Sequence, residues 1–135
     1  MVKLVIGHKS GKTKQIDFED SKILSGKKIG DTFKGELIEL PGYELKITGG
    51  SNASGFPMRK DVNSSEKKSI LLVSGVGLKK VLRKGMRRRK TVAGNTVSAR
   101  TAQLNLAVVK DGPVSLFEEP KADEPASDAE SPKEA

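Results

Sequence analysis

Residues 2–18, VKLVIGHKSGKTKQIDF, decide between two kinds of fold, one with a phosphate-binding loop followed by a helix and one with a β-hairpin. The apolar run Val2–Ile6 predicts a short strand, and the Gly-Lys-Thr triplet that follows it is typical of a phosphate-binding loop. Such a loop has four residues between its glycines and a helix after its lysine. Here only three residues lie between Gly7 and Gly11, and Thr13–Phe18 alternates polar and apolar residues as a strand does. The pattern therefore predicts a β-hairpin with a basic tip and excludes a nucleotide-binding P-loop.

Alternation and turn residues continue beyond this hairpin. Asp20 and Ser21 predict the start of a single helical turn that runs through Leu24 and ends at Gly26. Closely spaced glycines and prolines separate further expected strands at Phe33–Glu39, Tyr43–Thr48, Ser69–Ser74, Val92–Val97 and Leu104–Val109. Short strands with such turns favour an all-β fold, a small antiparallel β-barrel of about six strands with one or two short helical turns.

The length of 135 residues is typical of one domain. The chain contains no cysteine, which excludes disulfides, thiolate metal sites and cysteine nucleophiles. No apolar run approaches the roughly 18 residues needed to cross a bilayer, and the N-terminus lacks the layout of a signal peptide. We therefore expect a cytoplasmic protein without a membrane partner.

Charge divides the chain into two parts. Residues 118–135 hold seven acidic residues and two lysines, a net charge of −5, so the +8 of the whole chain leaves +13 for residues 1–117. The acidic segment is poor in apolar residues and cannot offset the entropy cost of ordering. We expect a basic domain over residues 1–117 and an acidic disordered tail over 118–135. A domain this basic suggests a polyanionic partner.

Catalytic constellations are not evident in the sequence. His8 is the only histidine, and in a glycine-rich turn we expect it to be exposed or to contact a phosphate. The carboxylates of residues 1–117 fall mostly at solvent-facing positions or in turns, and a pair brought together by folding stays open. We expect no enzymatic activity, no cofactor, no metal site and no small-molecule substrate.

The densest basic run is KKVLRKGMRRRK, Lys79–Lys90, in which eight of twelve residues are cationic. Such a run is often only a solvated loop, but both ends of this one continue into predicted strands, which hold its cations close together. Close like charges repel one another unless an anion neutralises them, and arginine binds phosphate oxygens bidentately. Most of the five aromatic residues occupy strand positions that fill a core, so folded RNA or duplex phosphate fits better than a stacked single strand.

An alternative interpretation of this run stays open. Four apolar residues recur in it at helical spacing: Leu78, Val81, Leu82 and Met86. A basic amphipathic helix there would suit an acidic protein or an anionic membrane surface. The protein would then be a basic binding module for one of these two kinds of surface.

The segment KITGGSNASGFPMR, Lys46–Arg59, carries a resemblance to a known family. A strand that ends in Gly-Gly is followed, after four residues, by Gly-Phe-Pro-Met and a basic residue. This pattern resembles the hallmark of the S6e family of small-subunit ribosomal proteins of archaea and eukaryotes. Further segments resemble the family in the same order: IGDTFKGEL (Ile29–Leu37), SILLVSGVG (Ser69–Gly77), RRRKTVAGNTV (Arg87–Val97) and LNLAVVKDG (Leu104–Gly112).

The resemblance implies a small β-barrel that is a structural constituent of the small ribosomal subunit and supports translation without catalytic activity. It implies two kinds of partner, ribosomal RNA of the small subunit and neighbouring ribosomal proteins. By the match of motifs, the glycine-rich loop and Arg87–Lys90 face the RNA. Together with the other basic loop residues, the expected RNA-binding residues are Lys12, Lys14, Gly49, Gly50, Arg59, Lys60, Lys79, Lys80, Arg83, Lys84, Arg87, Arg88, Arg89 and Lys90.

Two segments depart from the family pattern. LKKVLRKGM (Leu78–Met86) stands where the family usually has a basic loop with proline and tyrosine. The acidic tail stands where eukaryotic members have a long basic extension with regulated phosphoserines. Ser127 and Ser131 are therefore not expected to be regulated in that way, and the short form resembles the archaeal members.

Overall fold

The structure, a computed structural model, describes residues 1–113 and Leu116. Most of its regular structure is strand, so the expected mainly-β class is confirmed. The predicted tail, residues 118–135, and the predicted domain end at Phe117 lie outside the described residues. The elements in chain order are β1 (Val2–Gly7), β2 (Thr13–Phe18), α1 (Ser21–Leu24), β3 (Thr32–Lys34), the 3₁₀ helix η1 (Gly35–Ile38), β4 (Glu44–Asn52), β5 (Lys67–Leu72), β6 (Arg88–Ala93) and β7 (Thr101–Lys110).

β1 and β2 form the predicted hairpin. They pair antiparallel over their whole length, with Gly7 opposite Thr13 at the turn. The His8 N–H donates a hydrogen bond of 3.0 Å to the Lys12 carbonyl and closes the turn. Gly11 has a φ of 86°, which residues with a side chain rarely adopt, so the turn requires a glycine there. A strand rather than a helix follows Lys12, as the alternation predicts.

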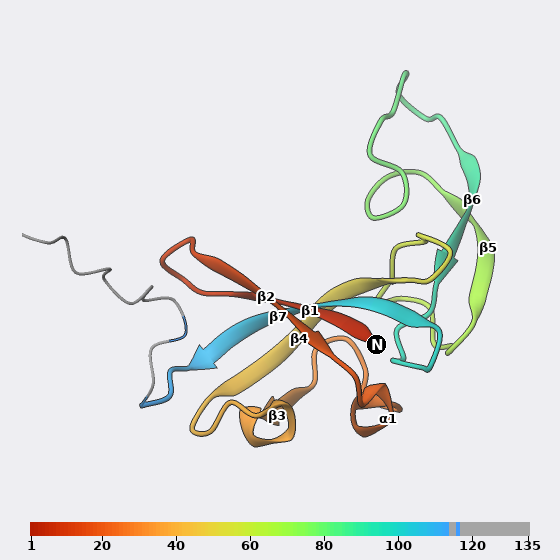
Figure 1. The fold of residues 1–135 in the computed structure, drawn as a ribbon. Coiled ribbons are helices and arrows are strands. Elements are labelled where there is room, and N and C mark those ends of the chain that lie inside the picture. The colour runs from red at the N-terminus through yellow and green to blue at the C-terminus, as the bar shows by residue number, and fades with distance from the viewer. Residues whose placement is uncertain (114–115, 117–135) are drawn as a thin grey trace, which may run out of the picture.

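Five strands form one twisted sheet in the order β2-β1-β7-β4-β3 (Figure 1). β7 lies at its centre, antiparallel to β4 and parallel to β1. The expectation of a wholly antiparallel fold is therefore wrong for the β1–β7 pair, because these strands lie far apart in the sequence and no hairpin turn sets their direction. The described strands are also not closed into a barrel. β2 and β3 are the two edge strands of the sheet and do not pair with each other, and β3 has only three residues.

The strand expected at Phe33–Glu39 is only partly formed. β3 ends early and η1 takes its place. The Gly35 N–H donates to the Tyr43 carbonyl at 2.7 Å, and the Gly35 carbonyl accepts from the Leu40 N–H at 2.9 Å, so the chain curls around this glycine. A side chain on Gly35 would collide with the Leu40 carbonyl. Alternation within the segment could not show this, because contacts with later residues set the turn and bring Ile38 into the core.

The main hydrophobic core is built from alternate residues of the three central strands. Its side chains come from β1 (Val2, Leu4, Ile6), β4 (Leu45, Ile47) and β7 (Leu104, Leu106, Val108). α1 adds Leu24 and η1 adds Ile38. The period of two along each strand places these residues on the same face of the sheet.

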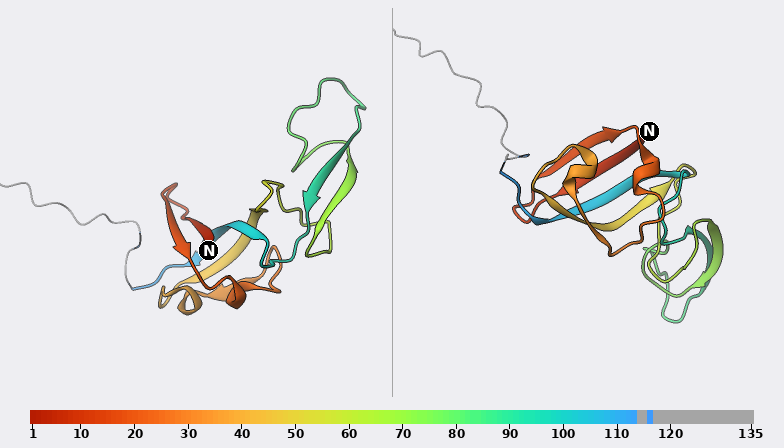
Figure 2. Two further views of the ribbon diagram at one scale, coloured as in Figure 1. Left: turned by 45° about the vertical axis from the view of Figure 1, so that its right-hand side comes forward. Right: turned by 90° about the horizontal axis from the view of Figure 1, so that it is seen from below.

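β5 and β6 form a separate two-stranded sheet. It projects from the five-stranded sheet in all three ribbon views (Figures 1 and 2). We name residues 67–93 the β5–β6 lobe and residues 73–87 its far loop. A second, small hydrophobic cluster holds the lobe together: Leu72, Leu78 and Val92.

The second strand of the lobe begins earlier than expected. β6 starts at Arg88, inside the basic run, because that run pairs with the apolar half of β5, Ile70–Leu72. The expected strand Val92–Val97 is therefore split. Its last residue leaves the lobe and returns to the main sheet, where the Val97 N–H donates to the Lys27 carbonyl at 2.8 Å.

Candidate nucleic-acid interface

The basic run predicted to bind RNA spans two parts of the β5–β6 lobe. Its first half lies in the far loop, and its second half enters β6. Eight basic residues of the run are exposed: Lys79, Lys80, Arg83, Lys84, Arg87, Arg88, Arg89 and Lys90. The fold therefore gathers these predicted residues in one lobe.

Strand pairing divides the basic residues of β6 between two faces. Arg89 pairs with Leu71, whose side chain is 55% exposed on the outer face. Arg88 pairs with Leu72, which is buried in the small cluster. Because paired residues lie on the same face of a sheet, Arg88 borders the inner face and Arg89 the outer one, and Lys90 lies on the same side as Arg88. The run thus presents cations on both sides of the hairpin.

The far loop, all of which is described, contains no helix. The Leu78 N–H donates to the Gly75 carbonyl at 3.0 Å, and the buried Leu78 side chain anchors the loop. Val81 and Leu82 are 41% and 69% exposed instead of packing with it. Gly85 has a φ of 79°, which breaks helical geometry. The amphipathic helix considered for this run is therefore wrong for this structure.

No cation of the lobe forms a salt bridge within the described part of the chain. The ion pairs of the described residues lie elsewhere: Arg59–Asp61, Lys110–Glu44 and His8–Asp111. The basic side chains of the far loop and β6 are therefore not neutralised by described carboxylates. The lobe has a positive field that favours a polyanion.

Arg59 has a structural place in the fold. Its Nη1 donates to the Val76 carbonyl at 2.8 Å, and its Nη2 donates to Asp61 Oδ2 at 2.6 Å. The side chain is only 16% exposed. Arg59 therefore ties the segment after β4 to the far loop, whereas its neighbour Lys60 is exposed.

The two predicted glycines lie in β4, where bulges shift its pairing with β7. The Gly50 carbonyl accepts a hydrogen bond of 2.9 Å from the Met58 N–H. A side chain on Gly50 would collide with the Gln103 carbonyl and crowd the Met58 sulfur, whereas Gly49 has open space around it. Gly50 therefore permits the segment Gly-Phe-Pro-Met to pack closely on the sheet.

Lys12 and Lys14 lie on the β1–β2 hairpin, far from the lobe. The tip of this hairpin and the far loop lie at opposite ends of the molecule in every view (Figures 1 and 2). Both lysines are exposed. The predicted basic residues therefore form two separate surfaces.

His8 connects the hairpin tip to Asp111, the residue that follows β7. Its Nδ1 lies 2.7 Å from Ser10 Oγ, and its Nε2 lies 3.1 Å from Asp111 Oδ1. The described residues hold no group of three or more histidine, cysteine or acidic side chains that could bind a metal ion. None of the described helices is long and apolar enough to cross a membrane.

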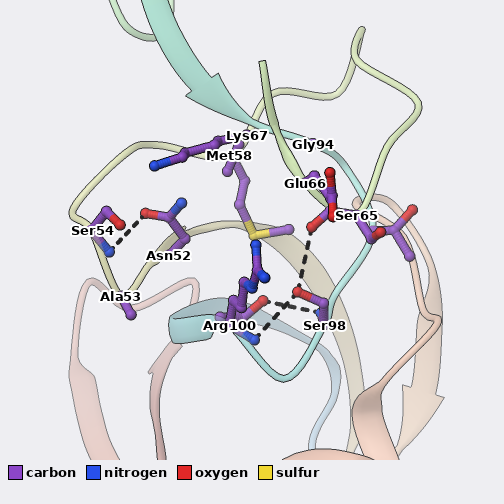
Figure 3. A pocket seen from close by; sticks show the side chains of 13 residues that line it. Asn52, Ala53, Ser54, Met58, Ser65, Glu66, Lys67, Gly94, Ser98 and Arg100 are labelled. Carbon is purple, nitrogen blue, oxygen red and sulfur yellow. Dashed lines mark hydrogen bonds between the residues drawn. The ribbon is translucent and has the colours of Figure 1, made fainter.

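A hollow of about 210 Å³ lies where the five-stranded sheet meets the lobe (Figure 3). Four segments line it: the end of β4 with the loop after it, the residues that lead into β5, the end of β6 with the residues after it, and the turn before β7. The Ala53 N–H donates to the Arg100 carbonyl at 2.8 Å and joins the first of these segments to the last. The polar side chains of the lining include Asn52, Ser54, Glu66, Lys67, Ser98 and Arg100.

Lys67 and Arg100 are not among the residues predicted from the sequence. Both line the hollow, but in the sequence almost the whole β5–β6 lobe lies between them. Only the fold brings them together, so charge density along the sequence does not find them. The only sequence feature that Lys67 and Arg100 share is a nearby serine, and basic residues close to serines are too common in loops to indicate a site.

The chain is similar to ribosomal proteins over most of its length. A family model described as Ribosomal protein S6e matches residues 2–119. The small ribosomal subunit protein eS6 of Methanococcus maripaludis (strain C6) is 47% identical over 113 residues, which cover 84% of this chain and 90% of the relative. Its counterpart in Methanocaldococcus jannaschii is 45% identical over 115 residues, 85% of this chain and 86% of the relative. That of Nanoarchaeum equitans is 48% identical over 113 residues, 83% of each chain.

These matches confirm the family that the motifs in residues 46–59 predicted. The matched region contains the five-stranded sheet, the hallmark loop and the lobe. The family is one of ribosomal proteins and not of enzymes, in agreement with the expected lack of catalytic activity. The chain belongs to the Ribosomal protein S6e family.

Proposed function

We propose that this chain is a structural constituent of the small ribosomal subunit in the cytoplasm, where it binds and scaffolds ribosomal RNA through the β5–β6 lobe. The names of its relatives support the ribosomal role. One observation carries the RNA contact: the lobe holds eight exposed basic side chains without a described carboxylate partner. Ribosomal RNA supplies the phosphate charge that such a surface needs.

The geometry of the lobe suits folded RNA. A paired hairpin holds its cations in fixed positions, so less side-chain and backbone freedom is lost on binding than in a flexible arm. Arg88 and Arg89 point to opposite faces of that hairpin. The lobe can therefore contact phosphates on both sides when it enters a groove or a junction, and each arginine can bind two phosphate oxygens.

The other predicted residues take different roles in this proposal. Lys12 and Lys14 form a second RNA contact on the distant β1–β2 hairpin. The exposed Lys60, whose carbonyl accepts a hydrogen bond of 3.3 Å from Asn95 Nδ2 just after β6, extends the basic surface of the lobe. Arg59 and Gly50 act indirectly, because one holds the far loop and the other permits the packing of the hallmark segment. The open surroundings of Gly49 let RNA approach its backbone closely.

A neighbouring ribosomal protein is the second partner. Leu71 and Val73, at the outer face of the lobe, are 55% and 52% exposed, and Val76 is 53% exposed in the far loop. Apolar side chains next to cations favour a protein surface that carries acidic and apolar residues. A non-ribosomal partner of that kind, or a membrane, was the alternative, and the missing helix removes its main support.

Salt dependence of RNA binding tests the proposal. We expect binding of the full chain to archaeal small-subunit ribosomal RNA to weaken about 10³-fold between 50 and 200 mM salt if some six phosphates are contacted. Replacing Arg88 and Arg89 by Ala should reduce the slope of log K against log salt by roughly two. Replacing Lys34 and Lys46 by Ala removes the same charge from exposed positions of β3 and β4 that are assigned no RNA contact, and serves as the matched control. Equal effects of the two pairs would contradict the assignment of the lobe as the main contact.

A further inference from the structure

The hollow between the five-stranded sheet and the lobe has the features of a nucleotide site. Resting on the proposed function, we propose that it receives one unstacked nucleotide of the bound RNA. Its base lies in the hollow and its phosphate lies at the rim. Sequence-dependent recognition of RNA uses such unstacked bases, because the grooves of an RNA helix expose little of their edges.

The floor of the hollow is apolar and its size suits one base. Met58 and Ala93 line it and are 5% and 6% exposed. A flat base packs well on such a surface, as flipped bases do between apolar side chains in other proteins. The volume of about 210 Å³ is below the range of roughly 300–1,000 Å³ that is usual for cofactors and drug-sized ligands. A single nucleobase is therefore the natural occupant.

Two side chains of the lining can read the polar edge of a base. Asn52 Oδ1 already accepts hydrogen bonds from the Ser54 N–H at 3.1 Å and the Phe56 N–H at 2.9 Å, so its Nδ2 is left to donate to a ligand. The Glu66 carboxylate has no salt bridge within the described chain and accepts from an amino group. Adenine, cytosine and guanine carry such an exocyclic amino group, and uracil does not.

Two cations stand where the phosphate of that nucleotide would lie. Lys67 and Arg100 line the hollow from opposite segments, and Figure 3 shows Lys67 extending along one rim toward Asn52 and Ser54. The Lys67 Nζ lies 5.8 Å from the centroid of the Phe56 ring, which holds the ammonium group close to the hallmark loop. Neither cation forms a salt bridge with a described carboxylate.

Other classes of ligand fit this lining less well. A metal ion prefers several carboxylates, and here Glu66 stands with Lys67 and Arg100. A free phosphate would pair with the rim cations but leave the apolar floor of Met58 and Ala93 without a contact. An apolar side chain of a protein would leave the polar rim without partners. A nucleotide combines an apolar face, donors, acceptors and an anion, and so matches each part of the hollow.

Chemical probing of the protein–RNA complex tests this inference. Archaeal small-subunit ribosomal RNA is probed with dimethyl sulfate and kethoxal for the base edges of A, C and G, with a carbodiimide for U, and with hydroxyl radicals for the backbone. Ser54→Trp fills the hollow from an exposed position. Lys67→Gln removes a rim cation, and Lys68→Gln is its matched control, because Lys68 is exposed but does not line the hollow.

We expect the wild-type chain and Lys68→Gln to protect the base edge of one unpaired A, C or G. Ser54→Trp should restore that base to its protein-free reactivity while the backbone footprint of the lobe remains. Lys67→Gln should weaken the protection and leave the footprint. Identical base reactivity with the wild-type chain and Ser54→Trp, or protection of a uridine instead, overturns the nucleotide site and leaves the proposed function standing. A wild-type chain without any backbone footprint overturns both.

Discussion

Gly49 and Gly50 are neighbours in β4 but meet different surroundings. The Gln103 carbonyl of β7 approaches Gly50 so closely that a single carbon added there overlaps it. A carbon added to Gly49 meets no atom within 4 Å. The Gly-Gly doublet therefore contains one residue that the packing requires and one that it does not, a distinction that the sequence alone does not make.

Alanine substitutions separate these two residues. We expect Gly50→Ala to lower the free energy of unfolding by about 2 kcal/mol, because β4 or Gln103 must shift to accept the methyl group. Gly49→Ala should be neutral or stabilise the fold by up to about 1 kcal/mol, since alanine loses less backbone entropy than glycine. Urea unfolding followed by circular dichroism measures both values. Similar losses for the two variants would contradict the close approach at Gly50.

Arg59 has contacts within the fold that its place in the sequence does not reveal. Its charge and its place after Gly-Phe-Pro-Met predict an RNA contact, and in the fold its guanidinium also donates to the Val76 carbonyl and to Asp61. Sequence gives the charge of a side chain and not the direction in which it points. For exposed Lys60, the next residue, the same prediction still stands.

At the scale of elements, sequence patterns predicted those strands and turns that depend on contacts between residues close together in the chain. The β1–β2 hairpin follows from alternation and a glycine turn within residues 2–18. η1 depends on Tyr43, and the parallel β1–β7 pair depends on strands from distant parts of the chain, so neither could be predicted from a window of sequence. The sequence does not show that Arg88 and Arg89 lie in a strand, so it does not predict that they face opposite sides of the hairpin.

The far loop offers a prediction at this scale. Arg59→Ala removes the hydrogen bond to the Val76 carbonyl, so backbone amides of residues 73–87 should exchange with solvent faster than in the wild-type chain. Arg59→Lys should resemble Arg59→Ala, because one ammonium group lacks the planar fork that joins Val76 to Asp61. Hydrogen exchange with mass spectrometry follows the loop, and Lys60→Ala is the control. An unchanged loop in Arg59→Ala would rule out this clamp.

The whole molecule has two hydrophobic clusters of unequal size. Among the described residues, the main core has fifteen buried members, whereas the cluster in the lobe has three. Stability in such a protein is not uniform, and a small cluster opens more easily than a large one. The lobe that we assign to RNA binding is thus the less stable part of the fold.

Removing buried carbons from each cluster tests this difference. Val92→Ala should cost about 1–3 kcal/mol and raise hydrogen exchange within β5 and β6 while β1 and β7 stay protected. Leu104→Ala, in the main core, should raise exchange throughout the molecule. Bound ribosomal RNA should slow the exchange of the lobe in Val92→Ala, because binding stabilises the folded state. Equal loss of protection in both sheets of Val92→Ala would show a single cooperative unit.

The site as a whole was predictable in part. Charge density found the lobe residues because they are contiguous in the chain, and the family motifs found the segment beside the hollow. The hollow itself was not predictable, since Asn52, Lys67 and Arg100 come from three segments that only the packing of the lobe on the sheet brings together.

The central position of β7 has a consequence for the synthesis of the protein. β1 and β4 are made early, but the strand that pairs with both is residues 101–110. A nascent chain that has not yet delivered this strand leaves two inner edges open, and open edges recruit other chains into aggregates. The sheet is therefore complete only after residues 101–110 have been made, and a chain that stops before them keeps the inner edges of β1 and β4 open.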